Sequence, residues 1–247
     1  MSRYNIPSNQ YDAYARSVHG VALLQQNDLG APACNNCHGN HGATPPGVES
    51  ISQVCGSCHV LNAELFSKSP HKQAFDRRQL PECETCHGNH AIVAATNQLL
   101  GNGPDAVCSR CHTQRENVKG FHAAGLMRHL VDSLDSDEEH ARELVDEAEQ
   151  KGMEIAEAKF RLRDIRQARL ETRTVVHAFS EDRFREVVGK GLTASTSVAG
   201  EAQAAIDEYY RRRIGLGVAT FIMSVLAVSL YLTIRRLERG NTGAGNT

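Results

Sequence analysis

The chain has 247 residues, a net charge of −2 at neutral pH, no tryptophan and only 5% aromatic residues. This length allows one large domain or two. The small net charge gives no indication of the basic surface that is typical of nucleic-acid-binding proteins, so we expect no nucleic-acid partner. So few aromatic residues are poor material for a conventional hydrophobic core.

The composition changes along the chain. All seven prolines lie at or before Pro104, whereas the stretch from His122 to Arg212 contains none and is rich in charged residues. Proline is common in turns and is excluded from helix interiors. We therefore predict a turn-rich first part and a helical second part.

The segment Cys-x-x-Cys-His occurs four times, at Cys34–His38, Cys55–His59, Cys83–His87 and Cys108–His112, and uses every cysteine in the chain. It is the attachment segment of c-type haem, in which two thiols form thioethers and the histidine binds the iron. Structural zinc is the alternative, because the gap from the first pair of cysteines to the second suits a zinc ribbon. Zinc, however, does not require a histidine directly after each second cysteine, and a thioredoxin-like redox motif would occur only once.

We therefore predict four covalently bound haem c groups. The predicted attachment residues are Cys34, Cys37, Cys55, Cys58, Cys83, Cys86, Cys108 and Cys111, and the proximal iron ligands are His38, His59, His87 and His112. Four porphyrins would also supply the apolar bulk that the composition lacks.

The four segments form two dihaem repeats, at about residues 17–59 and 69–112. Each repeat has two further histidines, and a six-coordinate haem needs a second axial ligand. We predict the distal ligands to be His19, His41, His71 and His90, with His122 and His129 in reserve. His41 and His90 each follow a proximal histidine by three residues, so each is expected to bind a different haem. His140 and His177 lie in charged helical surroundings, and we expect them to be solvated.

On these motifs, about residues 10–115 resemble the multihaem c-type cytochromes of the class III and doubled-motif kind. The most specific likeness is Cys-His-Gly-Asn-His at Cys37–His41 and again at Cys86–His90. The resemblance implies a tetrahaem cytochrome that carries electrons between membrane respiratory or photosynthetic complexes and soluble redox partners.

The expected fold is mainly α. A haem-organised tetrahaem cytochrome c domain with little regular structure would occupy residues 1–120, and a helical hairpin or stalk residues 121–212. A capping box at Ser136–Glu139 predicts the start of the first hairpin helix. Gly189-Lys-Gly191 predicts the turn, and the second helix would begin near Thr193 or Ser195.

A transmembrane helix is predicted over residues 213–236, followed by a cytoplasmic tail over residues 237–247. Its central stretch, Ile214–Ile234, carries no charge between two arginine clusters and would span about 30 Å. Covalent haem attachment takes place outside the bacterial cytoplasm, which predicts a single-pass protein of the cytoplasmic membrane with its haem domain on the periplasmic side. No export signal is visible in Met1–Gln10, so we expect a misplaced or trimmed start.

The predicted function is electron transport between a quinone-linked membrane redox complex and periplasmic electron carriers, as a subunit of a larger respiratory-chain complex. The alternative is a multihaem reductase or oxidase of a small nitrogen or sulfur compound, with one open haem site. Because four spare histidines match four haems, we expect an electron-transfer subunit rather than a stand-alone enzyme, and we predict no catalytic residue.

Overall fold

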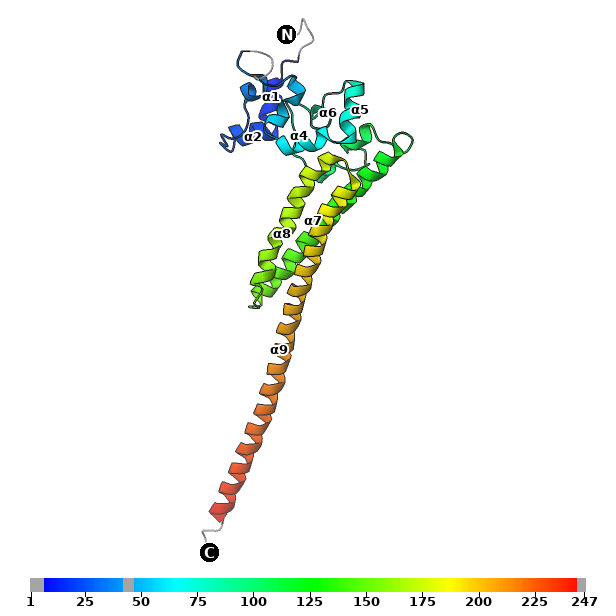
Figure 1. The fold of residues 1–247 in the computed structure, drawn as a ribbon. Helices are drawn as coiled ribbons and strands as arrows, with labels where there is room; N and C mark the ends of the chain where they lie inside the picture. The colour runs from blue at the N-terminus through cyan, green and yellow to red at the C-terminus, as the bar shows by residue number, and fades with distance from the viewer. Residues whose placement is uncertain (1–6, 42–46, 244–247) are drawn as a thin grey trace. The chain divides into compact units, whose positions relative to one another are not determined.

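The structure is a computed structural model that describes residues 7–41 and 47–243, with side chains to Arg239. These residues are mainly helical and contain no strand (Figure 1). The chain divides into two compact units: one holds Met1–Glu138 and Arg163–Ser195, and the other Glu139–Leu162 and Thr196–Thr247. The first unit therefore combines the cysteine-rich region with segments of the helical half. The division does not fall at residue 120, where the sequence analysis placed a domain boundary.

The cysteine-rich region consists of short helices joined by loops. They are α1 (Gln10–Ala15), α2 (Val18–Leu24), α3 (Cys34–His38), η2 (Ile51–Ser57), α4 (Val60–Ser67), α5 (Pro70–Arg78), α6 (Glu84–His87), η3 (Asn97–Leu99) and η4 (Val107–Arg110). The buried apolar side chains described there are few: Val54, Phe66, Phe75 and Ala106. A polypeptide core this small fits the expectation that another apolar group completes the interior.

Beyond residue 117 the described chain has three long helices, α7 (Val118–Gln150), α8 (Ala156–Val175) and α9 (Glu181–Gly243), with the short η5 (Val176–Ala178) between the last two. The prediction of a two-helix hairpin was wrong in the number of helices and in the place of the turns. Ser136–Glu139 lies inside α7, and Gly189-Lys-Gly191 lies inside α9.

The observed turns have clear local causes. Gly152 has φ +74°, a left-handed conformation that glycine adopts without strain, and it follows the end of α7 directly after Lys151. At the next corner Phe179 has φ +48°, and Ser180 then precedes α9, whose first residues are Glu181 and Asp182. Acidic residues in the first turn stabilise the amino-terminal end of a helix.

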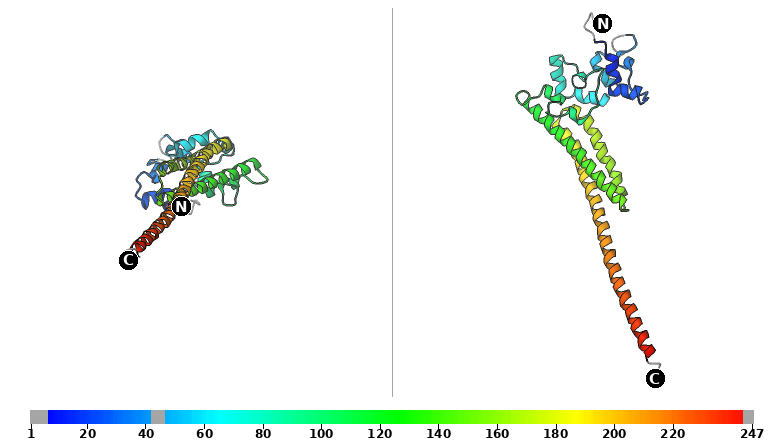
Figure 2. Two further views of the ribbon diagram at one scale, coloured as in Figure 1. Left: turned by 90° about the horizontal axis from the view of Figure 1, so that it is seen from below. Right: turned by 180° about the vertical axis from the view of Figure 1, so that it is seen from behind.

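Within the first unit, segments of α7, α8 and α9 lie side by side (Figures 1 and 2). Their buried side chains recur every three, four or seven residues, which is the spacing of one helix face. They include Val131 and Leu134 of α7, Ile165 and Ala168 of α8, and Phe184 and Val188 of α9.

The second unit continues the same pattern with smaller side chains. Its buried residues are Ala141, Val145 and Ala148 of α7, Ile155 and Ala158 around the start of α8, and Val198, Ala202 and Ile206 of α9. Lys151 lies over the rings of Tyr209 and Tyr210, 5.2 Å and 5.0 Å from their centres. Arg161 forms an ion pair with Glu201. These contacts join the three helices within this unit.

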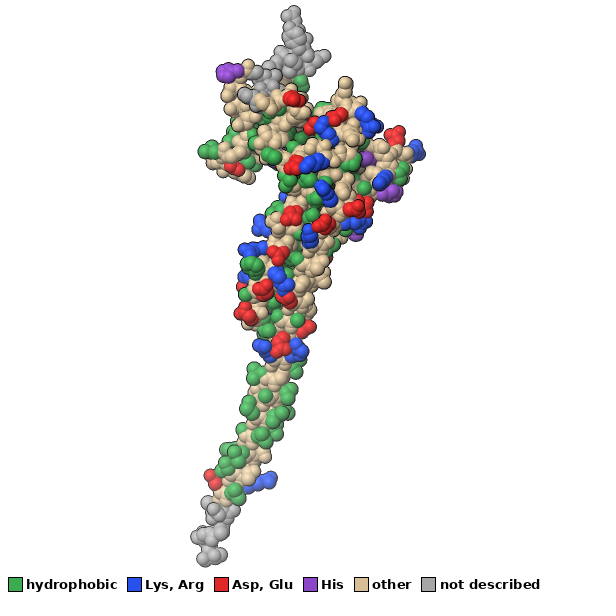
Figure 3. Space-filling view, in the orientation of Figure 1, with side chains coloured by type: hydrophobic (Ala, Val, Ile, Leu, Met, Phe, Trp, Pro, Cys, Tyr) green, Lys and Arg blue, Asp and Glu red, His purple; other side chains and the backbone are tan. Residues whose placement is uncertain are grey.

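Apolar side chains are exposed along the last part of α9, and Figure 3 shows them on the face in view. The large ones from Ile214 to Leu237 are roughly half or more exposed. Among the helices that the structure describes, α9 is the one long and apolar enough to cross a membrane. It could therefore be a membrane span, as the sequence predicts; residues 244–247 of the predicted tail lie outside the described part.

Candidate functional site

Each Cys-x-x-Cys-His segment forms a single turn of backbone. In three motifs the backbone amide of the histidine donates a hydrogen bond to the carbonyl of the first cysteine. The distances are 2.9 Å for His59, 3.0 Å for His87 and 2.9 Å for His112. The first motif forms the short helix α3. A turn closed in this way presents both thiols and the imidazole of one motif from the same short stretch of chain.

The eight thiols suit covalent attachment. All are free, and each is exposed or half-buried. Within the described ranges, no group of three or more His, Cys, Asp or Glu side chains could hold a metal ion. This arrangement does not fit a zinc ribbon, which needs four converging ligands.

Instead, the imidazoles come in pairs, and each pair contains one motif histidine. The ring centres of His59 and His19 are 6.2 Å apart, and those of His38 and His90 are 5.8 Å apart. The other two pairs are His112 with His71, at 5.8 Å, and His87 with His177, at 6.0 Å.

This spacing is the one that a shared metal ion requires. An imidazole nitrogen binds a transition metal at about 2 Å and the ring centre lies about 1 Å further out, so two rings on opposite sides of one iron are about 6 Å apart. The paired residues therefore suit haem, and each pair of imidazoles would hold one iron. In that arrangement the eight cysteines would hold the porphyrins, and the paired rings would bind the irons.

His19 and His71 occupy equivalent positions in two helices. In each case a buried serine, Ser17 or Ser69, precedes the helix, and the histidine is its second residue. The Ser17 hydroxyl accepts a hydrogen bond from the amide of Gly20 at 3.0 Å, which caps α2. The repeated Ser-x-His sequence thus acts as a helix start that orients the imidazole.

His90 reaches the first motif because the chain turns sharply after α6. Gly88 ends that helix with φ +74°, a backbone conformation that favours glycine. The turn carries His90 away from its neighbour His87 and next to His38. From the sequence, His90 is predicted to serve a different haem from its neighbour His87, and in the structure its ring lies beside that of His38.

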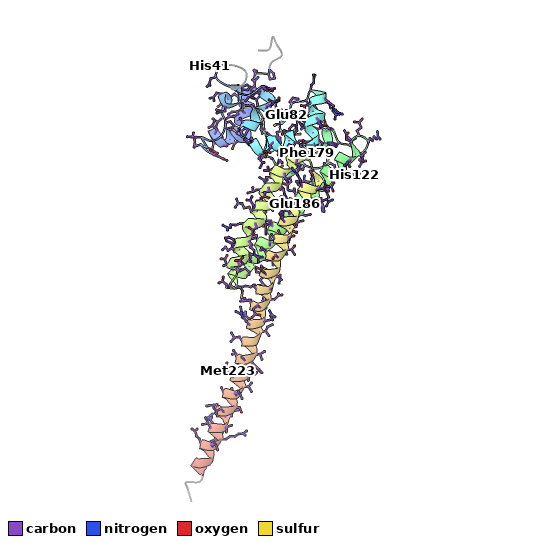
Figure 4. All side chains as sticks on the ribbon, viewed as in Figure 1. His41, Glu82, His122, Phe179, Glu186 and Met223 are labelled. Carbon is purple, nitrogen blue, oxygen red and sulfur yellow. The ribbon has the colours of Figure 1, made fainter. Side chains whose placement is uncertain are left out.

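His41 has the equivalent position in the first repeat but a different environment. It is exposed, and among the described residues no imidazole lies beside it. Figure 4 shows it at the outer edge of the cysteine-rich region, away from Phe179. A distal ligand must lie opposite a motif histidine. The structure does not place His41 beside one, which differs from the prediction. The reserve candidates His122 and His129 are also exposed, on α7.

His177, which the sequence analysis expected to be solvated, holds the place beside His87. It lies in η5, half-buried, where the buried Ala178 follows it. Its flanking residues Val176, Ala178 and Phe179 are apolar, and this local signal could have distinguished it from the charged helices on either side.

Burial favours the metal-binding form of four of the paired imidazoles. It is the main cause that lowers the pKa of four rings, those of His19, His71, His87 and His177. In the first three, the imidazole of the pair partner lowers the pKa further. A lowered pKa favours the neutral form, whose ring nitrogen has the free lone pair that a metal needs.

Consecutive motifs are neighbours in space. The thiols of Cys55 and Cys83 share a hydrogen bond, which lowers the pKa of Cys55 and raises that of Cys83. Burial, together with the nearby thiol of Cys108, raises the pKa of Cys86 to about 11. Burial also raises the pKa of Cys37, with a further contribution from Cys55. The attachment residues thus form a continuous series from the first motif to the fourth.

A family model matches part of the chain. It describes the doubled CXXCH motif and covers residues 74–117, which hold the third and fourth motifs. No curated protein and no solved structure matches. The match supports a multihaem c-type cytochrome, and the motifs indicate covalently bound haem c.

Proposed function

We propose that this chain is a membrane-anchored tetrahaem cytochrome c that carries electrons between a quinone-linked membrane redox complex and periplasmic electron carriers. The observation that carries the proposal is that every Cys-x-x-Cys-His segment has a second imidazole about 6 Å from its own. Haem c, when bound, supplies one-electron exchange at iron without a change of ligands.

The polypeptide would contribute rigid placement. Buried serines, a left-handed glycine and short helices position the imidazoles before any electron is exchanged. A pair of nitrogen ligands that stays in place in both oxidation states limits the rearrangement that accompanies electron transfer. The contact between Cys55 and Cys83 supports close spacing between the groups of the two repeats.

The apolar part of α9 supports the anchor. Arg211, Arg212 and Arg213 precede the charge-free stretch, and Arg235 and Arg236 follow it. Arginines at both ends of an apolar helix are typical of a span whose charged side chains reach the two interfaces. Because haem is attached outside the cytoplasm, we assign the cysteine-rich region to the periplasmic side and residues 237–247 to the cytoplasm. A place within a larger respiratory complex belongs to the same proposal.

A reductase or oxidase of a small nitrogen or sulfur compound is the rival function. Such an enzyme needs an iron with one open axial position, so at least one motif histidine would have no second imidazole opposite it. The four pairs therefore favour the carrier over the enzyme.

Mass spectrometry and membrane assays test the proposal together. The intact mature chain should exceed its polypeptide mass by four haems, and its oxidised spectrum should be low-spin throughout. Membranes that contain the protein should reduce it when a quinol is added. Fewer than four added haems would contradict the tetrahaem assignment, and four haems that quinol never reduces would contradict the quinone-linked partner. A high-spin iron in the native protein that binds nitrite or hydroxylamine would favour the enzyme.

A further inference from the structure

We infer that His177, which lies outside both repeats, is the second axial ligand of the haem attached at Cys83, Cys86 and His87, in the place that repeat symmetry assigns to His41. The inference rests on the proposed function, because it concerns how one of the four haems is bound. It goes further in making the corner between α8 and α9 part of the haem site.

The geometry of the pair carries the inference. The ring centres of His177 and His87 are 6.0 Å apart and their planes differ by 24°. The pairs of His38 with His90 and of His59 with His19 have nearly the same values, 5.8 Å with 20° and 6.2 Å with 28°. The distance and the angle between His177 and its motif histidine are thus close to those of these two repeat pairs.

The other ring nitrogen of His177 is already engaged. Its Nδ1 lies 3.0 Å from the carbonyl oxygen of Thr174, and since a carbonyl only accepts, Nδ1 carries the proton. This leaves the lone pair on Nε2, which would form the coordinate bond to iron while the ring stays neutral. A hydrogen bond of this kind fixes the tautomer and the orientation of metal-bound histidines. No electron or proton is exchanged when the bond forms.

The corner that carries His177 is firmly packed. Helix α4, which directly follows the second motif, packs against η5. Phe179 lies with its ring centre 3.8 Å from that of His71 and 6.4 Å from that of Phe66. Three residues thus place one side chain beside His87 and another against the distal histidine of the fourth motif. Both contacts, of His177 with His87 and of Phe179 with His71, hold this corner against the cysteine-rich region.

His41 provides the matched control. By repeat symmetry His41 is the counterpart of His90, and it should therefore bind the third haem; in the structure it is exposed and unpaired with any imidazole that is described. The two assignments, His177 or His41 as the second ligand of the third haem, predict opposite results for the same iron. Substitution of the true ligand opens that iron, whereas substitution of the other leaves it unchanged.

The test compares His177→Gly with His41→Gly in the full-length protein isolated with its haems. In His177→Gly we expect four haems by intact mass and a high-spin signal equivalent to one of them in electron paramagnetic resonance. Added imidazole should enter the space left by the side chain and restore the low-spin spectrum. His41→Gly should keep four low-spin haems.

The inference is overturned if His177→Gly holds four haems that all stay low-spin, or if the high-spin signal arises in His41→Gly instead. Intact mass reports on the tetrahaem proposal and spin state on the ligand, so the two can fail separately. If His177→Gly does not accumulate, His177→Met decides, because methionine also binds haem iron and raises its potential. We expect one haem in four to shift to a higher midpoint potential in that variant; four unchanged potentials would overturn the inference.

Discussion

The imidazole planes of His71 and His112 meet at 71°, although their ring centres are 5.8 Å apart like those of the other pairs. Phe179 lies beside the ring of His71, with the two ring centres 3.8 Å apart. In the other three pairs the planes differ by only 28°, 20° and 24°. The fourth motif is therefore distinguished from the rest by the orientation of its axial candidates.

This difference predicts a distinct magnetic signature. Nearly parallel imidazoles separate the energies of the two iron orbitals that overlap with their π systems, whereas steeply crossed imidazoles leave them nearly equal and make the g-tensor strongly anisotropic. We expect electron paramagnetic resonance of the oxidised protein to show one highly anisotropic low-spin haem and three rhombic ones. His71→Met should remove the anisotropic signal, and His19→Met, at the equivalent helix position, should remove a rhombic one. Four alike signals would contradict the assignment.

Gly120 is a position where even a substitution by alanine is expected to disturb a haem ligand, His112. A Cβ atom at this position would lie 2.1 Å from Nδ1 and 2.3 Å from Cε1 of His112. In an ordinary helix, Gly→Ala stabilises by about 1 kcal/mol, but here the methyl group would push the proximal imidazole away. We expect Gly120→Ala to give a high-spin component from the fourth haem in the visible spectrum. Gly103→Ala, where a Cβ meets nothing within 4 Å, is the control and should keep the native spectrum.

The attachment residues and most of the paired histidines were predictable because they are local or repeated. Cys-x-x-Cys-His indicates haem attachment by itself, and Ser-x-His recurs as a helix start. His177 was not predictable in this way, because it has no counterpart in the other repeat and its partner His87 lies far along the chain. Only the folding of α8 and α9 brings them together, and no sequence period describes that contact.

The helical half was misread for a related reason. Glycine is typical both of turns and of close helix contacts, and sequence alone does not separate these uses at Gly189 and Gly191. In the structure a Cβ on Gly191 would lie 2.7 Å from Leu134 and 3.0 Å from Ala168, so the residue serves close packing inside α9. The apparent capping box at Ser136 lies within a helix that continues through it.

These two glycines form a matched pair for a stability experiment. Both lie in α9, but a Cβ on Gly189 meets nothing within 4 Å. We expect Gly189→Ala to stabilise the protein by up to about 1 kcal/mol through helix propensity alone. Gly191→Ala should destabilise it by about 1–3 kcal/mol, because the methyl group overpacks the contact with Leu134. Denaturant unfolding followed by helical circular dichroism measures both. Equal effects of the two substitutions would mean that α7, α8 and α9 do not pack closely at Gly191.

The membrane anchor can be tested by placing one charge at two depths of the same helix. Leu226 and Leu237 are both exposed on α9, at 63% and 68%, but only Leu226 lies within the charge-free stretch. An arginine near the centre of a span opposes insertion by about 2.5–3.5 kcal/mol, whereas one near the end reaches the interface. We expect Leu226→Arg to reduce the haem protein recovered in the membrane fraction severalfold and Leu237→Arg, beside Arg235 and Arg236, to leave it unchanged. Haem spectra of both variants should match the native protein, since neither residue belongs to the unit that holds the paired imidazoles. If both variants stay fully membrane-bound after a carbonate wash, the apolar end of α9 is not what holds the chain to the membrane.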